Sequence, residues 1–393
     1  MNIGIYLGNI DEKIGGGFTF QDSILEGLKS YESKDNIFVF WYGKEVSSPI
    51  KNINFINIQK TLTDNILSKI TRKYKKLFKK GLKTSKLTQL SELYKIDLFW
   101  FPTPNFESVS VPYIYTVWDL NHRINPYFPE IHNEWDERER IYQSILPKAS
   151  YIVTGTEEGK EEISFYYKIH PERIKIINFP LPKSCSPKTA DSHKDFKEFK
   201  PYLYYPAQFW AHKNHVQILK AIAFLKNHHN TKVNAIFTGH DYGNSHYLKS
   251  LCKQYSIEDQ IHFLGFVSIE EKNQIYKNAL ALVYPSYFGP DNLPPLEAFY
   301  FKCPVICGLY KGAKQQLKEN ALYFELNDYK SLAEHILTIK DNVSIRDDLV
   351  SRAFKFVENM SPKNYVESAF RIIDELKDIR SCWSYSGYEI LSR

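Results

Sequence analysis

Short apolar runs alternate along the chain with longer segments in which apolar residues recur every three or four positions. The short runs are typical of strands buried on both faces of a parallel sheet, and the longer segments are typical of helices that cover such a sheet. Two successive series of strands are therefore expected. The first series comprises residues 2–8, 37–42, 53–58, 96–101, 113–118, 151–154 and 174–179, and the second comprises 202–206, 234–239, 261–266, 279–284, 304–307 and 321–324.

This order predicts an α/β protein with two doubly wound domains. A polar stretch with Ser-Pro and Lys-Pro boundaries separates the two series, and we expect it to be a linker. The expected first domain covers residues 1–183, the linker 184–200 and the second domain 201–360. A serine-proline pair at Ser361 is typical of a helix start, and residues 361–393 are predicted to contain a helix that crosses back onto the first domain. The cleft between the domains is the natural place for a ligand.

The segment after the expected strand 279–284 indicates such a site. A turn of Gly, Pro and Asn leads into a helix, with Asn292 as a favourable N-cap and with Pro294 and Pro295 in the first turn, where a missing N–H costs little. Free N–H groups at a helix start suit a diphosphate. Glu297, one turn further, is placed to accept from the two hydroxyls of a ribose. The alternative is that Glu297 is only an acid favoured by the helix dipole.

The composition is that of an ordinary globular protein, with 393 residues, 43% of them hydrophobic and 24% charged. This length suits two domains. No stretch approaches the roughly 20 apolar residues that span a bilayer, and the first residues lack the basic start of a secretory signal. A cytoplasmic protein is therefore expected. No pattern of His, Cys or acidic residues indicates a metal site.

Residues 69–86, which begin at Lys69 and end at Lys86, hold nine Lys or Arg and no acid, and they account for the net charge of +6. Apolar residues recur within this segment every three or four positions, which predicts an amphipathic basic helix. Such a helix binds anionic membrane surfaces. The alternatives are a docked helix with a solvated basic face, and a nucleic-acid contact, for which no motif accompanies the charge.

Several sequence blocks, taken together and in order, resemble those of the retaining glycosyltransferases of family 4. The resemblance implies the GT-B fold, in which two Rossmann-like domains face each other across a cleft, and a nucleotide-diphosphate sugar as donor, with no cofactor and no metal. The blocks are GGGFTF (15–20), TVWDLNHRINPYFPE (116–130), YIVTGTEEGKEEI (151–163), YPAQFWAHKNHVQILKA (205–221), FTGHDYG (237–243), IHFLGFVSIEEKNQIYKNALALVYPS (261–286) and NLPPLEAF (292–299).

The resemblance gives several residues a role toward the donor. Lys213 matches the lysine that contacts the diphosphate, where a cation offsets the charge that develops on the leaving nucleotide; the alternative is a solvated loop lysine. Glu297 matches the acid that binds ribose, and Phe266 and Val267 match residues beside the base, with core packing as a further role. The glycines after the first strand either line the cleft or form a flexible loop. The expected donor-binding residues are Gly16, Gly17, Gln208, Lys213, Gly239, Phe266, Val267, Asn292, Leu293 and Glu297.

The chain departs from the family pattern in the donor half. The first acid of the Glu-x7-Glu motif falls on Gly289 and is absent. Asp291 either replaces it or is an exposed turn aspartate. An arginine that often precedes the lysine is also missing, because this chain has Ala207 and Gln208 there. These departures concern the identity of the sugar more than the binding of the nucleotide.

A second departure lies in the first domain, where Trp118 precedes Asp119 and many family members have a histidine. Tryptophan accepts no proton. Asp119 is the first catalytic candidate, with a helix N-cap as the alternative. His122 is the second candidate, with a structural histidine bonded to backbone as the alternative. In a front-face retaining mechanism the leaving phosphate oxygen accepts the proton of the acceptor, so the loss of the histidine is compatible with catalysis.

The predicted function is retaining transfer of a hexose to a growing glycan, as in the assembly of surface polysaccharide or O-antigen on a lipid carrier. Such an enzyme would work in the cytoplasm, with the basic segment against the membrane. The alternative is a catalytically silent GT-B-like binding subunit, which the missing acid and Trp118 favour and which Lys213 and Glu297 disfavour.

Overall fold

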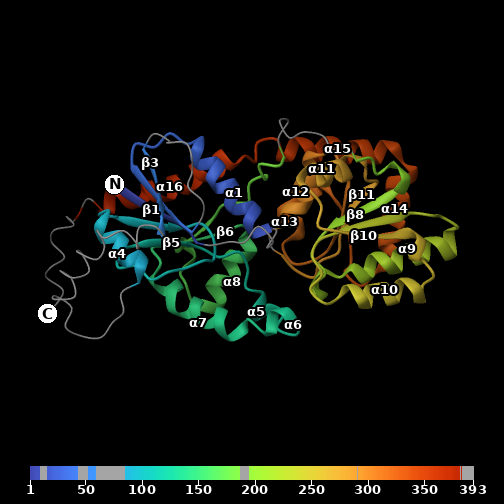
Figure 1. Cartoon of the computed structure of the whole chain (residues 1–393), viewed down its shortest axis with the longest axis horizontal. Coiled ribbons are helices and arrows are strands. Elements are labelled where there is room, and N and C mark those ends of the chain that lie inside the picture. The colour runs from blue at the N-terminus through green and yellow to red at the C-terminus, as the bar shows by residue number, and fades with distance from the viewer. Residues whose placement is uncertain are drawn as a thin grey trace.

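The computed structural model describes residues 1–8, 16–42, 52–58, 85–185, 194–289, 291–380 and 382. Most of the predicted basic helix lies outside these residues. Within them are two parallel sheets, one of seven strands and one of six, which lie next to each other along the long axis of the molecule with helices around each (Figure 1). The prediction of two doubly wound α/β domains is confirmed.

The first sheet has the strand order β3-β2-β1-β4-β5-β6-β7, and every neighbouring pair is parallel. Nearly every residue of β1, β4, β5 and β6 is buried, which explains why these strands appear in the sequence as continuous apolar runs. The strands are β1 (Asn2–Gly8), β2 (Asn36–Trp41), β3 (Ile53–Asn57), β4 (Leu98–Phe101), β5 (Tyr113–Thr116), β6 (Tyr151–Thr154) and β7 (Ile174–Ile176), and the helices are α1 (Gly16–Lys29), α4 (Lys86–Leu93), α5 (Asn121–Ile124), α6 (Pro129–His132), α7 (Trp135–Ile145) and α8 (Glu157–Tyr167).

The second sheet has the order β10-β9-β8-β11-β12-β13 and is again parallel throughout. The strands are β8 (Tyr202–Pro206), β9 (Asn234–Thr238), β10 (Ile261–Gly265), β11 (Ala281–Tyr284), β12 (Val305–Gly308) and β13 (Leu322–Phe324). The helices are α9 (His215–His229), α10 (Ser245–Gln254), α11 (Ile269–Asn278), α12 (Leu293–Tyr300), α13 (Ala313–Leu317), α14 (Tyr329–Asp341), α15 (Val343–Val357) and α16 (Pro362–Arg380).

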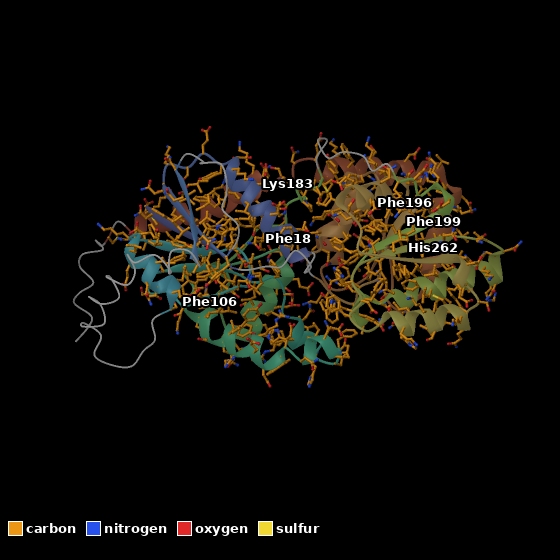
Figure 2. All side chains as sticks on the ribbon, in the orientation of Figure 1. Phe18, Phe106, Lys183, Phe196, Phe199 and His262 are labelled. Atoms are coloured by element: carbon orange, nitrogen blue, oxygen red, sulfur yellow. The ribbon has the colours of Figure 1, made fainter. Side chains whose placement is uncertain are left out.

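The chain enters the second domain through residues that precede β8. Phe196 is fully buried in the core of that domain. The ring of Phe199 packs on His262 of β10 with 4.3 Å between the ring centroids (Figure 2). Both phenylalanines lie within the predicted linker, so its last residues form part of the packed second domain.

Helix α16 returns from the second domain and packs beside α1 (Figure 1). The side chain of Ser361 accepts the N–H of Asn364 at 3.2 Å, as expected of a cap. Val366 of α16 is fully buried in one cluster with residues of β1 and α1. The two helices meet closely at Gly27, where an added Cβ atom would lie 2.4 Å from the carbonyl oxygen of Pro362.

The predicted element ends differ from the structure in a few places. Strand β11 begins at Ala281 and not at residue 279, because the N–H of Ala279 still donates to Tyr276 at the end of α11. Strand β5 ends at Thr116, and β7 ends at Ile176. Helix α1 begins at Gly16, so Gly16 and Gly17 are helical and not part of a flexible loop. None of the described helices is long and apolar enough to cross a membrane.

Candidate functional site

The carboxyl ends of the strands in the second sheet face the first domain. Three contacts establish this orientation, one after β8, one after β11 and one after β12: His212 bonds to Glu130, Asp291 bonds to Phe179, and Lys311 pairs with Glu158. Ligands of open parallel sheets bind at this edge. The candidate site is therefore the space between the two domains, where the loops of the second sheet meet the first domain.

Lys213 ends the short turn after β8 and is half-buried. Its Nζ lies 5.9 Å from the ring centroids of both Tyr284 and Phe288, and no carboxylate among the described residues pairs with it. Burial lowers the pKa of Lys213 to about 8, against the opposing effect of the carboxylates of Asp119 and Glu130 from the first domain. A partly desolvated cation that faces both domains is suited to bind a phosphate.

Glu130 holds the turn that carries Lys213. Its Oε1 accepts the backbone N–H of His212 at 3.0 Å and lies 2.5 Å from His212 Nδ1. Burial opposes ionisation of Glu130, but the bonds from His212 lower its pKa to about 2. Burial and the charge of Lys213 lower the pKa of His212 to about 4. At neutral pH a neutral His212 therefore donates Nδ1–H to an ionised Glu130.

Glu297 is the fifth residue of α12, and its side chain is 5% exposed. Its Oε1 accepts from Lys272 Nζ at 2.6 Å, and its Oε2 accepts from the hydroxyl of Tyr276 at 3.0 Å. Burial opposes the charge of Lys272, but Glu297 raises the pKa of this lysine above its ordinary value. Each carboxylate oxygen keeps a second acceptor position. The sequence did not indicate Lys272 or Tyr276 as partners of Glu297.

Asn292 is the N-cap residue of α12, as predicted, but its side chain does not cap the helix. It accepts from the Tyr284 hydroxyl at 2.6 Å and donates to Tyr310 and to the carbonyl of Gly289. Two of the first four positions of α12 are prolines and carry no N–H, so the helix start offers an anion fewer donors than its position alone suggested. Leu293, the first residue of α12, is buried. Lys213 is therefore a stronger candidate than the start of α12 for binding an anion.

Gly289 explains why the first acid of the motif is absent. Its φ is +128°, a conformation that residues with a side chain rarely adopt. A Cβ atom there would lie 2.3 Å from Oδ1 of Asn292. Asp291 is neither an exposed turn residue nor free to replace the acid, because its Oδ2 accepts the N–H of Phe179 at 2.8 Å and its Oδ1 accepts from Gln316 at 2.6 Å. Burial raises the pKa of Asp291 to about 8, against these two hydrogen bonds.

The residues expected near the base lie at the ends of β9 and β10. Phe266 is 67% exposed and stacks on His240 with 5.2 Å between centroids, so core packing is the wrong interpretation for this ring. Val267 is half-buried and packs against the core of the second domain. Gly239 has φ +145°, and a Cβ atom there would meet the carbonyl oxygen of Ala207 at 2.5 Å. A flat exposed ring beside closely packed backbone is suited to a nucleobase.

Asp119 follows β5 and is 26% exposed. Its Oδ1 accepts from Nη2 of Arg138 at 2.7 Å and from the N–H of Asn121 at 3.0 Å. Burial alone would raise the pKa of Asp119, but the charge of Arg138 and these bonds lower it. The N-cap residue of α5 is Leu120, so Asp119 bonds to the start of α5 without being its cap residue. The charge of this oriented carboxylate also acts on Lys213 of the second domain, where it opposes the lowering of the lysine pKa.

His122 is fully buried in the first domain. Its Nε2 lies 3.2 Å from both Glu139 Oε2 and the Tyr167 hydroxyl. Burial and the nearby Arg138 lower its pKa to about 4, so the ring is neutral at pH 7. Its partners are side chains and not the backbone groups expected of a structural histidine. The structure brings His122 into the core of the first domain and does not bring it to the donor residues.

The other expected residues have simple positions. Trp118 packs by its edge on Phe20 and Phe179, with 5.5 and 6.2 Å between centroids. Gly16 and Gly17 form the first turn of α1, and Gly16 is exposed with open space around a Cβ position. The side chain of Gln208 accepts from Trp210 Nε1 at 3.1 Å. Within the described part of the chain, no group of three or more His, Cys, Asp or Glu side chains is arranged to hold a metal ion.

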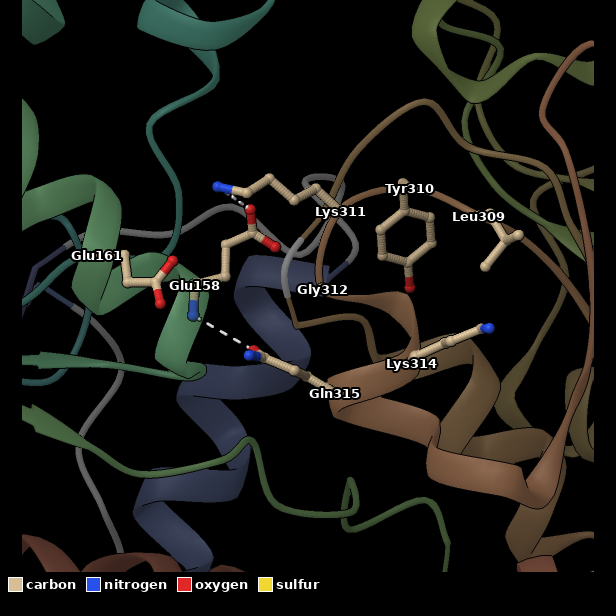
Figure 3. A pocket seen from close by; sticks show the side chains of 8 residues that line it. All are labelled: Glu158, Glu161, Leu309, Tyr310, Lys311, Gly312, Lys314 and Gln315. Carbon is tan, nitrogen blue, oxygen red and sulfur yellow. Dashed lines mark hydrogen bonds and ion pairs between the residues drawn. The ribbon is translucent and has the colours of Figure 1, made fainter.

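A cavity of about 370 Å³ lies where α8 of the first domain meets the loop after β12 and α13 of the second (Figure 3). Lys311 crosses it to Glu158, with 2.5 Å between Nζ and Oε1, and reaches Glu162 at 3.6 Å. Gln315 accepts the N–H of Glu158 at 3.2 Å. Burial and the charge of Glu158 raise the pKa of Glu162 to about 8. No residue of this cavity was expected from the sequence.

Comparison with known proteins agrees with this architecture. Residues 188–356 match the model of the family described as Glycosyl transferases group 1. The chain is 27% identical over 240 residues to the O-antigen chain mannosyltransferase RfbU of Salmonella typhimurium, and 24% identical over 243 residues to the O-antigen chain mannosyltransferase B of Escherichia coli. Each match covers 60% of this chain but less than two thirds of the relative, 63% and 64% respectively.

Solved structures extend the likeness to both domains. WaaG, a glycosyltransferase involved in lipopolysaccharide biosynthesis, superimposes with a TM-score of 0.64 at 12% identity, covering 95% of this chain and 99% of WaaG. Anabaena Alr3699/HepE in complex with UDP and glucose gives a TM-score of 0.66 at 15% identity, covering 96% of this chain and all of that one. At such identities the likeness shows the fold, which is GT-B. Residues 188–356 are therefore similar to the glycosyl transferases group 1, and the chain as a whole has the GT-B fold.

Proposed function

We propose that the protein is a retaining, metal-independent glycosyltransferase that moves a hexose from a nucleotide-diphosphate sugar to a growing glycan. The observation that carries the proposal is Lys213. This partly desolvated cation lies at the carboxyl edge of the second sheet and has no carboxylate partner among the described residues. The charge of Asp119, from the other domain, acts on this lysine.

The donor is proposed to lie along the second domain. Lys213 and the start of α12 bind the diphosphate, Glu297 accepts from the ribose hydroxyls, and the base lies against Phe266 and Val267. Lys272 and Tyr276 support this role of Glu297, because their hydrogen bonds fix the position of its carboxylate. Gly239 supports the proposed donor site as well, since a residue without a side chain allows the backbone there to pack closely against Ala207.

The chemical step breaks the bond between the anomeric carbon and the phosphate oxygen and forms a bond from that carbon to the acceptor hydroxyl. The leaving phosphate oxygen accepts the proton of the acceptor, so no protein base is required. Lys213 stabilises the negative charge that develops on the diphosphate. Asp119, held ionised by Arg138, is proposed to orient the sugar or acceptor hydroxyls and to stabilise positive charge at the anomeric centre.

The acceptor is proposed to be a glycan on a lipid carrier, at the cytoplasmic face of a membrane. The cavity lined by Glu158, Lys311 and Gln315 is the proposed entry for its terminal sugar, because both domains line it with groups that bind hydroxyls. Two curated relatives are mannosyltransferases, so mannose is the first donor sugar to test. Residues 69–86 are the proposed membrane contact.

The test is a transfer assay in which UDP-glucose, UDP-galactose and GDP-mannose are each incubated with the protein and with lipid-linked glycan from the producing cells. Release of one nucleotide together with extension of the glycan supports the proposal, and the anomeric configuration of the product tests retention. Nucleotide binding without release or transfer from any donor would contradict the proposal and support the silent binding subunit.

A further inference from the structure

We infer that Glu130 of the first domain is a positioning residue for the turn Ala211–Lys213, so that the diphosphate site is complete only when the two domains are closed. This inference rests on the proposed function. It concerns a contact between residues that are 82 positions apart in the chain.

Hydrogen bonds from both domains hold the turn Ala211–Lys213 in place. The hydroxyl of Tyr205 donates to the carbonyl of Lys213 at 3.0 Å, and the N–H of Tyr287 donates to the carbonyl of His212 at 2.9 Å. Both of these donors belong to the second domain. The N–H of His212 is different, because its acceptor is Glu130 of the first domain. Among the described residues, no group of the second domain accepts the N–H of His212, next to Lys213.

Aromatic packing reinforces the contact. Phe128 lies two residues before Glu130 and packs on His212, Tyr287 and Phe288, with 6.0, 5.4 and 6.3 Å between the ring centroids. His212 in turn stacks on Phe288 at 4.2 Å. The ring of Phe288 is one of the two over which Lys213 Nζ lies. The segment around α6 thus contacts the same aromatic group that positions the lysine.

The contact between His212 and Glu130 is buried, so its loss is expected to be costly. The side chains of His212 and Glu130 are only 8% and 9% exposed. When the domains are closed, loss of the Glu130 carboxylate leaves the N–H and the ring Nδ1–H of His212 buried without an acceptor, and such groups are costly to leave unpaired. The turn is then expected to rearrange or the domains to open, and either change moves Lys213 away from the phosphate.

The experiment compares nucleoside diphosphate and nucleoside as probes, with calorimetry for the former and ligand-observed NMR for the latter. The nucleotide is whichever of UDP and GDP the wild-type protein binds. Glu130→Ala is expected to weaken diphosphate binding roughly tenfold and to leave binding of the nucleoside unchanged. Glu130→Gln keeps an acceptor oxygen and is expected to recover part of the loss. Glu134→Ala, an exposed acid four residues further on, is the control and should bind as the wild type does.

A second arm uses His212→Ala and the double variant Glu130→Ala/His212→Ala. Because both residues act through one contact, the double variant should bind the diphosphate about as weakly as either single variant. Equal weakening of nucleoside and diphosphate, additive losses, or no loss in Glu130→Ala would each overturn the inference. Failure of the wild-type protein to bind any nucleotide would instead overturn the proposed function on which it rests.

Discussion

On the second-domain side of the cleft, the polar groups come from residues just after strands and from α12, and the key cation, Lys213, has no carboxylate partner among the described residues. On the first-domain side they come from the segment after β5 and from α8, and they are already paired, Asp119 with Arg138 and Glu158 with Lys311. A cation without a counter-charge has binding energy to give to an anionic ligand. Carboxylates that are already paired are better suited to orient hydroxyl groups. Under the proposed function, this difference favours donor binding by the second domain and orientation of the reacting groups by the first.

The largest expected effect follows from removing the cation. Lys213→Ala should lower the transfer rate by roughly two to three orders of magnitude, because the charge that develops on the leaving diphosphate loses its main stabilising group. The measurement is steady-state kinetics with the donor that the protein uses. Lys220→Ala, in α9, which follows the turn that carries Lys213, is the control and should be close to wild type. Activity of Lys213→Ala within a few-fold of wild type would remove the distinction between the two sides.

Glu297 and Lys272 allow binding and stability to be separated. Glu297→Ala leaves the partly buried Lys272 without its partner, and we expect a loss of about 1–3 kcal/mol in the free energy of unfolding together with much weaker nucleotide binding. In Glu297→Ala/Lys272→Met the unpaired charge is gone. This double variant should regain most of the stability, as measured by denaturant unfolding, but not the nucleotide binding. Recovery of both properties would show that Glu297 is only a structural partner of Lys272.

On the first-domain side, Asp119→Asn should act on the reaction and not on donor binding. We expect kcat to fall roughly tenfold, the size of a charge-assisted hydrogen bond, while the Kd of the nucleoside diphosphate stays unchanged. Kinetics and calorimetry on the same preparation check both values. Asp136→Asn, an exposed acid at the start of α7, is the control. A large rise in Kd for Asp119→Asn would place donor binding on both sides of the cleft.

The smallest effect is a dependence on pH. Burial lowers the pKa of Lys213 to about 8, so the side chain is charged at pH 7 and loses its charge as the pH rises through 8. Affinity for the nucleoside diphosphate should therefore fall, by up to roughly tenfold between pH 7 and pH 9. Lys213→Ala should show a flat profile over this range. A flat profile in the wild-type protein would mean that another group binds the diphosphate.

The fold was predictable because parallel strands buried on both faces leave continuous apolar runs in the sequence. Candidate residues such as Lys213 and Glu297 could also be predicted from the sequence, because they lie in short segments after such runs. The residues that contact the site from the other domain could not be predicted. Glu130 contacts His212 across 82 positions, and Phe179 contacts Asp291 across 112 positions, so both pairs depend on how the two domains pack.

Local chemistry explains the other differences. Asp291 was expected either to face the sugar or to lie exposed in a turn, and it instead joins the two domains, because Gly155 leaves room for its carboxylate. His122 was considered for the cleft, but its position in the short helix α5 directs it into the first-domain core, against Glu139 and Tyr167. The sequence pattern did not indicate in which direction the side chain of His122 points.

The most direct test of the central claim is calorimetric titration of the wild-type protein and of Glu297→Ala with UDP, GDP, dTDP, ADP and CMP, accompanied by thermal-shift measurements. The account predicts saturable binding of one nucleoside diphosphate, clearly weakened in the variant. If none of the nucleotides binds to the wild-type protein, the nucleotide-sugar site proposed for the second domain does not exist.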